Sequence, residues 1–252
     1  MTSPALSVRR VRDLTVVDQA GLPSWIIACD SVGSIGPKPA DAYPADARTV
    51  AHFAARVPLV EALATGASPQ IIVDTLSVEL DPTGREMIAE ICALAAELGL
   101  GPERVTGSTE DNVPSAATGI GVTVLATAAE LRPGTASAGE RVLCLGRPTS
   151  APHDRVEIGD RRMISLEALA AVLRVDGVSD VLPVGSKGVG HEAGELAATN
   201  GLTLLPSAHD VDLAHSGGPA SCVLVAVRPD AVDAVLAAVP ADLPWAEIGA
   251  LA

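Results

Sequence analysis

The residues Gly107–Asn112, GSTEDN, concentrate polar chemistry between two apolar segments. A loop that only reverses the chain needs a glycine or an asparagine and one carboxylate, so two hydroxyls and two adjacent acids exceed what a turn requires. A helix N-cap with acids in the first turn is the alternative use of such residues. The following segment, 119–125, is rich in β-branched residues and favours a strand. We therefore interpret GSTEDN as a ligand-binding loop.

Three acidic residues stand where the pattern predicts burial or the end of a strand. Asp30 follows the apolar run 25–29, Glu61 lies on the apolar stripe of a predicted helix, and Asp111 lies in GSTEDN. A carboxylate buried among apolar side chains is costly unless a cation or several donors meet it, so these positions favour a bound divalent ion. Mg²⁺ is the candidate, because no His or Cys spacing indicates zinc. The alternative is that the three are separate caps and solvated surface acids.

Two glycine-rich turns are candidate phosphate sites. In the first, Gly33 and Gly36 would let the backbone approach a phosphate, and Lys38 would neutralise it. The segment is neither a Walker A loop nor GxGxxG. The second, GSKGVG at 185–190, opens a predicted helix. A third polar stretch, 209–215, holds two histidines and two aspartates without the regular spacing of a structural metal site, so we interpret it as a solvated loop, with metal ligation as the alternative.

The composition excludes several classes of function. Of 252 residues, 31 are acidic and 17 basic, and the net charge of −14 argues against a nucleic-acid or anionic membrane partner. No apolar run approaches the length of a membrane helix or forms the core of a signal peptide, so we expect a soluble cytoplasmic protein. The four cysteines lie far apart in apolar contexts, which favours buried free thiols.

The hydrophobic pattern predicts strands and helices arranged in two lobes. We expect strands at 25–29, 70–80, 120–125, 141–145, 178–183 and 221–227, and helices at 46–67, 83–98, 165–173 and 191–200. Pro58 is expected to kink or split the first helix. Small and turn-forming residues at 132–139 mark a boundary, which gives domains 1–134 and 135–252. Because strands and helices alternate without a strict repeat, the pattern favours an α+β fold.

The order of these segments resembles the aminoimidazole-ribonucleotide-synthetase-like (PurM-like) superfamily, which includes thiamine-monophosphate kinase and selenophosphate synthetase. The matching positions are Asp30 after the first core strand, Glu61 ahead of the helix end 62–69, and the loop TGSTED at 106–111. The likeness covers about residues 20–130 and continues loosely through 140–230. Ser108 departs from the more usual second glycine of the loop, and Glu61 departs from aspartate. The resemblance implies a two-lobed fold, with an N-terminal mixed sheet packed by helices and a smaller α/β C-terminal lobe.

Within the superfamily, four phrases resemble the α-ribazole kinase branch: IACDSVGSIGPKPAD, FAARVPLVEAL, VDTLSVELDPTGREMI and GSTEDN. This likeness implies an ATP- and Mg²⁺-dependent kinase that phosphorylates the 5′-hydroxyl of α-ribazole for the lower ligand of cobalamin. The alternatives are another PurM-like enzyme, acting on thiamine monophosphate or closing a ring like aminoimidazole ribonucleotide synthetase, and a nucleotide-binding module without turnover.

The resemblance also implies roles for the candidate residues. Mg²⁺ would be held by Asp30, Glu61 and Asp111, with Glu110 as the alternative to Asp111. Lys38 would stabilise the γ-phosphate, and Asp74 is the candidate base for the sugar hydroxyl. The nucleotide contacts would come from Gly33, Gly36, Lys38, Gly107, Ser108 and Thr109. A homodimer through the N-terminal domain is implied in the same way.

Overall fold

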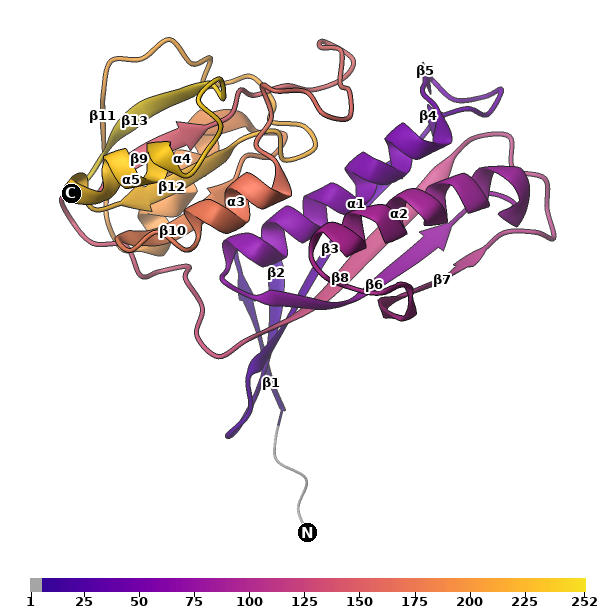
Figure 1. The fold of residues 1–252 in the computed structure, drawn as a ribbon, viewed down its shortest axis with the longest axis horizontal. Coiled ribbons are helices and arrows are strands. Elements are labelled where there is room, and N and C mark those ends of the chain that lie inside the picture. Colours follow the sequence, from indigo (N-terminus) through magenta and orange to yellow (C-terminus); the bar gives the residue numbers. More distant parts are fainter. Residues whose placement is uncertain (1–5) are drawn as a thin grey trace. The chain divides into compact units, whose positions relative to one another are not determined.

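The computed structural model describes residues 6–252, which form two compact units, each built on its own sheet (Figure 1). Unit 1 runs to Ala62 and resumes at Ala67–Ala129, and unit 2 comprises Leu63–Gly66 and Glu130–Ala252. The mixture of helices and sheets confirms the expected α+β class.

Unit 1 contains a six-stranded sheet in the order β1-β2-β3-β8-β6-β7. The strands are β1 (Leu6–Val11), β2 (Leu14–Gln19), β3 (Ser24–Gly33), β6 (Ser68–Leu76), β7 (Val105–Thr109) and β8 (Gly119–Ala128). All neighbours pair antiparallel except β6 and β7, which are parallel, so the sheet is mixed as the resemblance implied. Two-residue strands β4 (Ile35–Gly36) and β5 (Tyr43–Pro44) form a separate parallel pair.

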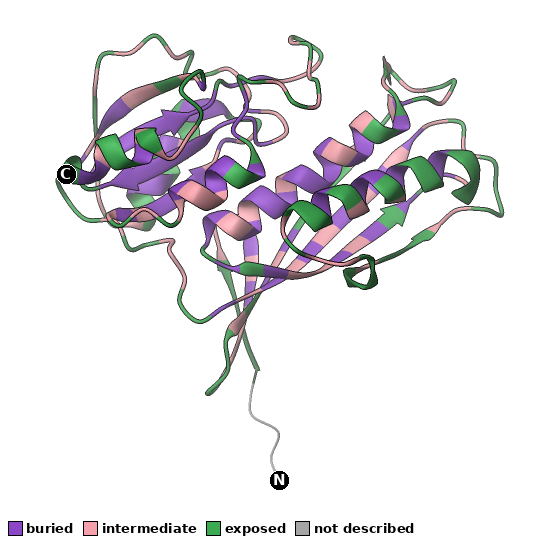
Figure 2. Ribbon diagram, viewed as in Figure 1, coloured by how far each residue is buried: buried purple, intermediate pink, exposed green. Residues whose placement is uncertain are grey.

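Helices α1 (Ala47–Ala64) and α2 (Arg85–Glu97) lie over one face of this sheet (Figure 1). The burial of β8 alternates strictly between buried and half-buried residues, which is typical of a sheet with one covered face (Figure 2). The predicted splitting of the first helix is wrong, because α1 continues through Pro58. Leu59 and Val60, directly after the proline, are fully buried, so packing offsets the lost backbone hydrogen bond.

A buried acid joins the two helices of unit 1. Glu90 of α2 accepts hydrogen bonds from Arg48 Nε at 2.6 Å and interacts with His52 Nδ1 at 2.8 Å, both on α1. Glu90 is only 6% exposed, so these partners offset the cost of burying its charge. The helix pair is thereby fixed over the sheet.

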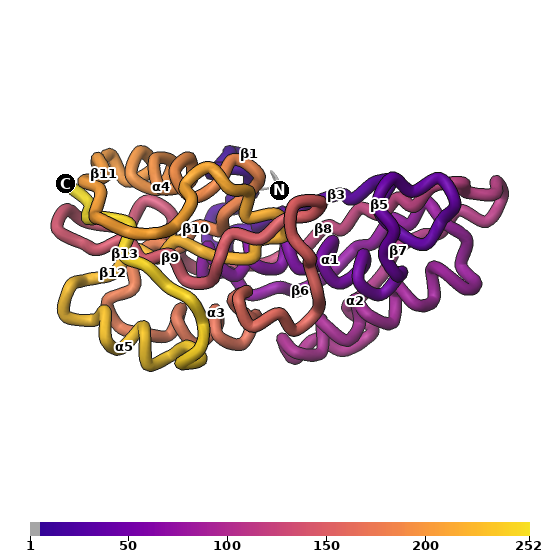
Figure 3. The backbone as a smooth tube through the Cα atoms, turned by 90° about the horizontal axis from the view of Figure 1, so that it is seen from above, coloured from indigo at the N-terminus to yellow at the C-terminus, as the bar shows by residue number. Residues whose placement is uncertain are grey.

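Unit 2 contains a five-stranded antiparallel sheet in the order β10-β12-β9-β13-β11. The strands are β9 (Arg141–Leu145), β10 (Val178–Pro183), β11 (Leu204–Pro206), β12 (Val223–Val227) and β13 (Trp245–Leu251). Helix α4 (Gly188–Thr199) covers one face, and α3 (Leu166–Val172) and α5 (Val232–Ala237) cover the other (Figure 3). Burial on both faces explains the uninterrupted apolar sequence of β12.

The cysteines differ in exposure. Cys144 and Cys222 are buried and Cys92 is half-buried, but Cys29 is exposed, so the prediction of burial is wrong for Cys29. This residue lies on the face of β3 opposite the buried Ala28. All four thiols are free. No helix within residues 6–252 has the length and hydropathy needed to cross a membrane.

Candidate functional site

Two carboxylates lie in one row across the sheet of unit 1. Asp30 of β3 and Asp74 of β6 both pair with Val122 of β8, and Asp74 also pairs with Gly107 of β7. Directly paired residues on neighbouring strands point to the same face, so both carboxylates lie on the face that α1 and α2 cover. A strand spacing of about 4.8 Å separates their Cα atoms by about 10 Å.

Asp74 is 2% exposed and occupies the space that a side chain at residue 107 would need. A Cβ on Gly107 would lie 2.2 Å from Oδ1 of Asp74 and 2.0 Å from its backbone oxygen. Burial raises the pKa of Asp74 to about 6. Burial, together with the Asp74 charge, also raises the pKa of the Cys92 thiol on α2. The glycine of the GSTEDN segment is therefore required by the buried acid.

Asp30 is half-buried, and burial raises its pKa against the smaller effect of a hydrogen bond from the Ser31 backbone. Within residues 6–252, neither Asp30 nor Asp74 forms a salt bridge. Two desolvated carboxylates without a cation fit the oxygen-ligand chemistry of Mg²⁺, whose remaining ligands are commonly water and phosphate.

A second polar cluster lies beyond the ends of β6 and β7. The Lys38 ammonium donates a hydrogen bond to Glu79, and Thr83 Oγ1 donates to the same carboxylate at 2.6 Å. These two bonds lower the pKa of Glu79 to about 2. Lys38, the predicted phosphate ligand, is thus paired with an acid that the sequence analysis missed. The available signal was an acidic residue near the end of the strand predicted at 70–80, shortly before the helix predicted at 83–98.

The two acids of GSTEDN stabilise their own loop. Asp111 accepts hydrogen bonds from Thr109 Oγ1 at 2.7 Å and from the Leu80 amide at 2.9 Å, and these bonds lower its pKa. Glu110 Oε1 accepts hydrogen bonds from the backbone amides of Asn112 and Val113 at 2.8 and 3.1 Å. The loop prediction is wrong for 107–109, because parallel pairing with β6 makes these residues an edge strand.

The two glycines of the first candidate turn differ in their surroundings. A Cβ on Gly36 would lie 2.2 Å from Thr118 Oγ1, whose hydroxyl is hydrogen-bonded to Asp41 at 2.7 Å. Asp41 also accepts from the Lys38 amide at 2.8 Å, so Gly36 is needed for internal packing. A Cβ on Gly33 would meet nothing within 4 Å. Open space for a ligand is therefore present at Gly33.

The predicted metal ligands are distributed over different parts of unit 1. Asp30 shares its row with Asp74, Asp111 lies beside Glu79, and Glu61 is half-buried on α1. In the part of the chain that the structure describes, no three His, Cys, Asp or Glu side chains are arranged to hold a metal ion. Asp30, Glu61 and Asp111 thus do not form a preformed ligand set. Ser108, on exposed β7, pairs with Thr75.

The second candidate turn packs against protein. A Cβ on Gly188, at the start of α4, would lie 2.6 Å from the Leu213 carbonyl oxygen, and the Gly190 amide donates to that oxygen at 2.9 Å. The glycines of GSKGVG therefore allow the loop containing Leu213 to approach the helix.

Replacing Gly107 with alanine tests the close contact with Asp74. Because the new Cβ would overlap the Asp74 backbone, we expect Gly107→Ala to destabilise the protein by about 1–3 kcal/mol, as overpacking does. Gly33→Ala is the matched control, since its Cβ enters open space. Denaturant unfolding of both variants measures the difference, and equal stabilities would contradict the contact.

The raised pKa of Asp74 predicts a pH-dependent stability cost. Because the folded-state pKa of about 6 exceeds the ordinary 3.8, the wild type loses stability as pH rises through this window. The total cost is about 3 kcal/mol, of which about 2 kcal/mol falls between pH 4.5 and 7.5. The free energy of unfolding of Asp74→Asn, relative to that of wild type, should therefore rise by about 2 kcal/mol between pH 4.5 and 7.5. Denaturant unfolding without metal measures this difference. A difference independent of pH would refute the buried charge.

Comparison with known proteins identifies the fold. No protein-family model and no curated protein matches the sequence. Among solved structures, thiamine-monophosphate kinase from Aquifex aeolicus is 14% identical, with a TM-score of 0.66 over 96% of this chain and 89% of that one. The same enzyme from Stenotrophomonas maltophilia is 16% identical, with a TM-score of 0.63 over 98% and 88%.

A second kind of protein shares the architecture. PurLQS from Thermotoga maritima is 17% identical, with a TM-score of 0.69 over 97% of this chain and 43% of that one. These structures cover both units of the chain. Together with the mixed sheet of unit 1, they show that this protein has the PurM-like fold that its sequence resembles.

Proposed function

We propose that the protein is an ATP- and Mg²⁺-dependent kinase of a small-molecule hydroxyl. The observation that carries this proposal is the row of two desolvated carboxylates, Asp30 and Asp74, on the helix-covered face of the sheet of unit 1. Burying two carboxylates is unfavourable, and the metal ion of a metal–nucleotide complex would neutralise their charge. A structural neighbour has been solved with the ATP analogue AMPPCP and TMP, which supports nucleotide use within this fold.

The roles of the residues follow from their positions. Of the three predicted metal ligands, Asp30 would hold Mg²⁺, whereas Glu61 and Asp111 lie in other parts of unit 1 and are not assigned to the same ion. The bound metal would supply neutralisation of phosphate charge, and phosphoryl transfer depends mainly on such electrostatics and on positioning. The Lys38 ammonium donates a hydrogen bond to Glu79, which would orient it toward a bound phosphate. The backbone at Gly33 and the hydroxyls of Ser108 and Thr109 contact the nucleotide; Gly36 and Gly107 shape this backbone.

Asp74 is proposed as the base that accepts the proton of the acceptor hydroxyl. A pKa of about 6 leaves the carboxylate ionised at neutral pH and more basic than an ordinary aspartate.

The acceptor that the sequence favours is α-ribazole, converted to α-ribazole 5′-phosphate for cobalamin lower-ligand assembly or salvage. The support is the likeness of four separate phrases of unit 1 to that branch. Thiamine monophosphate is the alternative acceptor, since thiamine-monophosphate kinases share the fold.

Product formation tests the proposed activity. Purified protein with Mg²⁺-ATP and α-ribazole should yield a phosphorylated nucleoside by mass spectrometry, and Asp30→Asn should lower its rate by a factor on the order of 10² or more. Asp176→Asn is the control, because this exposed carboxylate of unit 2 pairs only with a surface arginine. If the protein phosphorylates thiamine monophosphate but not α-ribazole, the kinase activity is retained and thiamine monophosphate is the acceptor. ATP binding without any product would make the protein a nucleotide-binding module.

We further propose a homodimer through unit 1. The sheet face opposite α1 and α2 carries a half-exposed apolar row, Ile27–Leu125–Ile71, across three neighbouring strands. Covering this face with a second copy would remove apolar surface from water. The family likeness favours this mode of pairing.

A charge placed in the middle of the row tests the dimer. Leu125→Lys should convert a dimer to a monomer in analytical ultracentrifugation, because the ammonium cannot be buried without a partner. Ala89→Lys, on the exposed side of α2, should leave the dimer intact. A wild-type monomer, or a Leu125→Lys dimer, would exclude this interface.

A further inference from the structure

A chain of two hydrogen bonds holds the ammonium of Lys38 in unit 1. Lys38 donates to one carboxylate oxygen of Glu79, and Thr83 Oγ1 donates to the other at 2.6 Å. Because both oxygens accept a hydrogen bond, the orientation of the Glu79 carboxylate is fixed. The bond from Lys38 and the smaller effect of Thr83 lower the pKa of Glu79 to about 2, so this carboxylate is ionised at neutral pH.

Thr83 presents its hydroxyl to Glu79 from a buried turn. It is 6% exposed and lies in the turn Leu80–Gly84, directly before α2. The Gly84 amide closes this turn by donating to the Glu79 carbonyl at 3.0 Å. A Cβ on Gly84 would lie 2.8 Å from the same carbonyl oxygen, so glycine is required for the turn to close.

The loop that carries Lys38 is held next to the start of β8. The Lys38 amide donates to Asp41 at 2.8 Å, and Asp41 accepts two further hydrogen bonds from Thr118, each at 2.7 Å. The ammonium of Lys38 has three donors, and within residues 6–252 it uses one of them, for Glu79. The other donors are therefore available to a phosphate while the bond to Glu79 is kept.

A lysine side chain has several rotatable bonds, and a phosphate that binds to it must restrict them. Contacts that fix the ammonium before the ligand arrives remove part of that cost. The Lys38 side chain is 16% exposed, so the surrounding protein also limits its movement.

We propose that Thr83 and Glu79 are positioning residues for the phosphates of the nucleotide, with Thr83 orienting Glu79 and Glu79 orienting Lys38. Neither Thr83 nor Glu79 contacts the phosphate itself. The inference deepens the proposed function and rests on it for the choice of a nucleotide as ligand.

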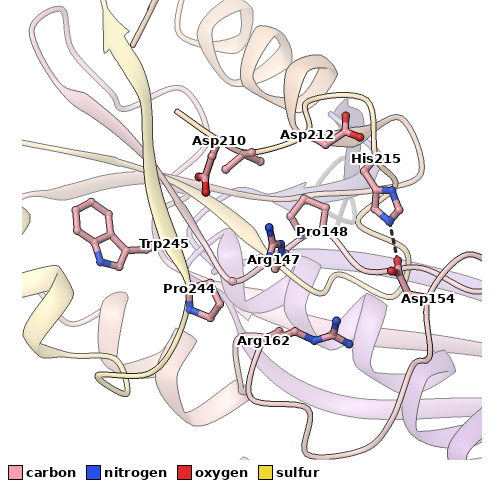
Figure 4. Close-up of a pocket in the computed structure, with 11 residues that line it drawn as sticks. Arg147, Pro148, Asp154, Arg162, Asp210, Asp212, His215, Pro244 and Trp245 are labelled. Carbon is pink, nitrogen blue, oxygen red and sulfur yellow. Dashed lines mark hydrogen bonds and ion pairs between the residues drawn. The ribbon is translucent and has the colours of Figure 1, made fainter. Parts of the chain in front are cut away.

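A cavity of about 430 Å³ in unit 2 is the alternative place for a phosphate (Figure 4). Its lining holds three aspartates and two arginines: Asp154, Asp210, Asp212, Arg147 and Arg162. Figure 4 shows Asp154 bonded to His215, at 2.6 Å, and Arg162 is bonded to Asp160. The Arg147 side chain forms no hydrogen bond or ion pair within the described residues. Because aspartates outnumber arginines, a polyphosphate would meet like charge in this cavity.

Calorimetric titration of the full chain with Mg²⁺-AMPPCP tests the proposal. Thr83→Val removes the hydroxyl and should raise the dissociation constant about threefold or more, because Glu79 loses a donor. The Glu79 side chain is 30% exposed, so water can replace that donor and the variant should fold. Thr83→Ser restores the hydroxyl and should bind like wild type.

A double-mutant cycle shows whether Thr83 acts through Lys38. Lys38→Met should raise the dissociation constant by about tenfold or more, because a charged donor to the phosphate is lost. In the Lys38→Met background, Thr83→Val should have no further effect. A purely structural role of Thr83 would weaken binding in both backgrounds.

Two further variants are the controls. Ser24→Ala removes a hydroxyl that donates to Asp18, a carboxylate also bonded by Arg9, at the start of β3. Arg147→Gln removes the cation of the unit 2 cavity. Both variants should bind Mg²⁺-AMPPCP like wild type.

NMR of protein labelled with ¹³C-lysine shows whether the nucleotide reaches Lys38. The sequence contains two lysines, and the other one, Lys187, is exposed in unit 2. Lys38→Met assigns the two sets of resonances. Mg²⁺-AMPPCP should shift those of Lys38 saturably and leave those of Lys187 unchanged.

Each outcome decides the question. Equal affinities of wild type and Thr83→Val, or an equal loss caused by Thr83→Val with and without Lys38, would overturn the positioning role. Binding with unmoved Lys38 resonances, or weakened by Arg147→Gln alone, would also refute it and leave the kinase proposal. If Mg²⁺-AMPPCP does not bind to the wild type, the proposed function and the positioning role are both wrong.

Discussion

The constraint on which the structure of unit 1 depends is the burial of two carboxylates on the helix-covered face of its sheet. Asp30 and Asp74 flank Val122 in register, and burial raises the pKa of both. Charge placed there opposes folding, so the surrounding packing must offset it. A cation that binds between these carboxylates would remove the cost of their burial. Because it would bind only the folded state, it would also raise the free energy of unfolding.

The rest of unit 1 is arranged around that constraint. Glu90 on α2 interacts with Arg48 and His52 on α1, so polar as well as apolar contacts hold the two helices together over the sheet. The edge strand β7 has Gly107 next to the Asp74 carboxylate, where a larger residue would not fit. After β7, Asp111 accepts a hydrogen bond from the Leu80 amide. Unit 2 differs, since its central strand β12 is buried on both faces and the polar residues that line its cavity come from loops beside the ends of its strands.

Regular elements and fold class followed from the sequence where the hydrophobic pattern was strong. The bounds of β9 and β10 agree with the strands predicted at 141–145 and 178–183, because both are bounded by turn residues. Strands β1, β2, β11 and β13 were missed. The short polar segment 107–109 became a strand only through pairing with β6, and Glu79 joined Lys38 across 41 positions of sequence. Such partners are set by tertiary contacts, which local propensity does not contain. The loop at 209–215, interpreted as solvated, lines the cavity of unit 2.

The central claim is that the carboxylate row binds a divalent metal together with a nucleotide. The most direct measurement is a titration of Mn²⁺, as a paramagnetic substitute for Mg²⁺, followed by electron paramagnetic resonance in the presence of AMPPCP. We expect saturable binding to wild type, weakened by about tenfold or more in Asp30→Asn and Asp74→Asn and unchanged in Asp176→Asn. Equal Mn²⁺ affinity in all four proteins would contradict the claim and move the metal away from this row.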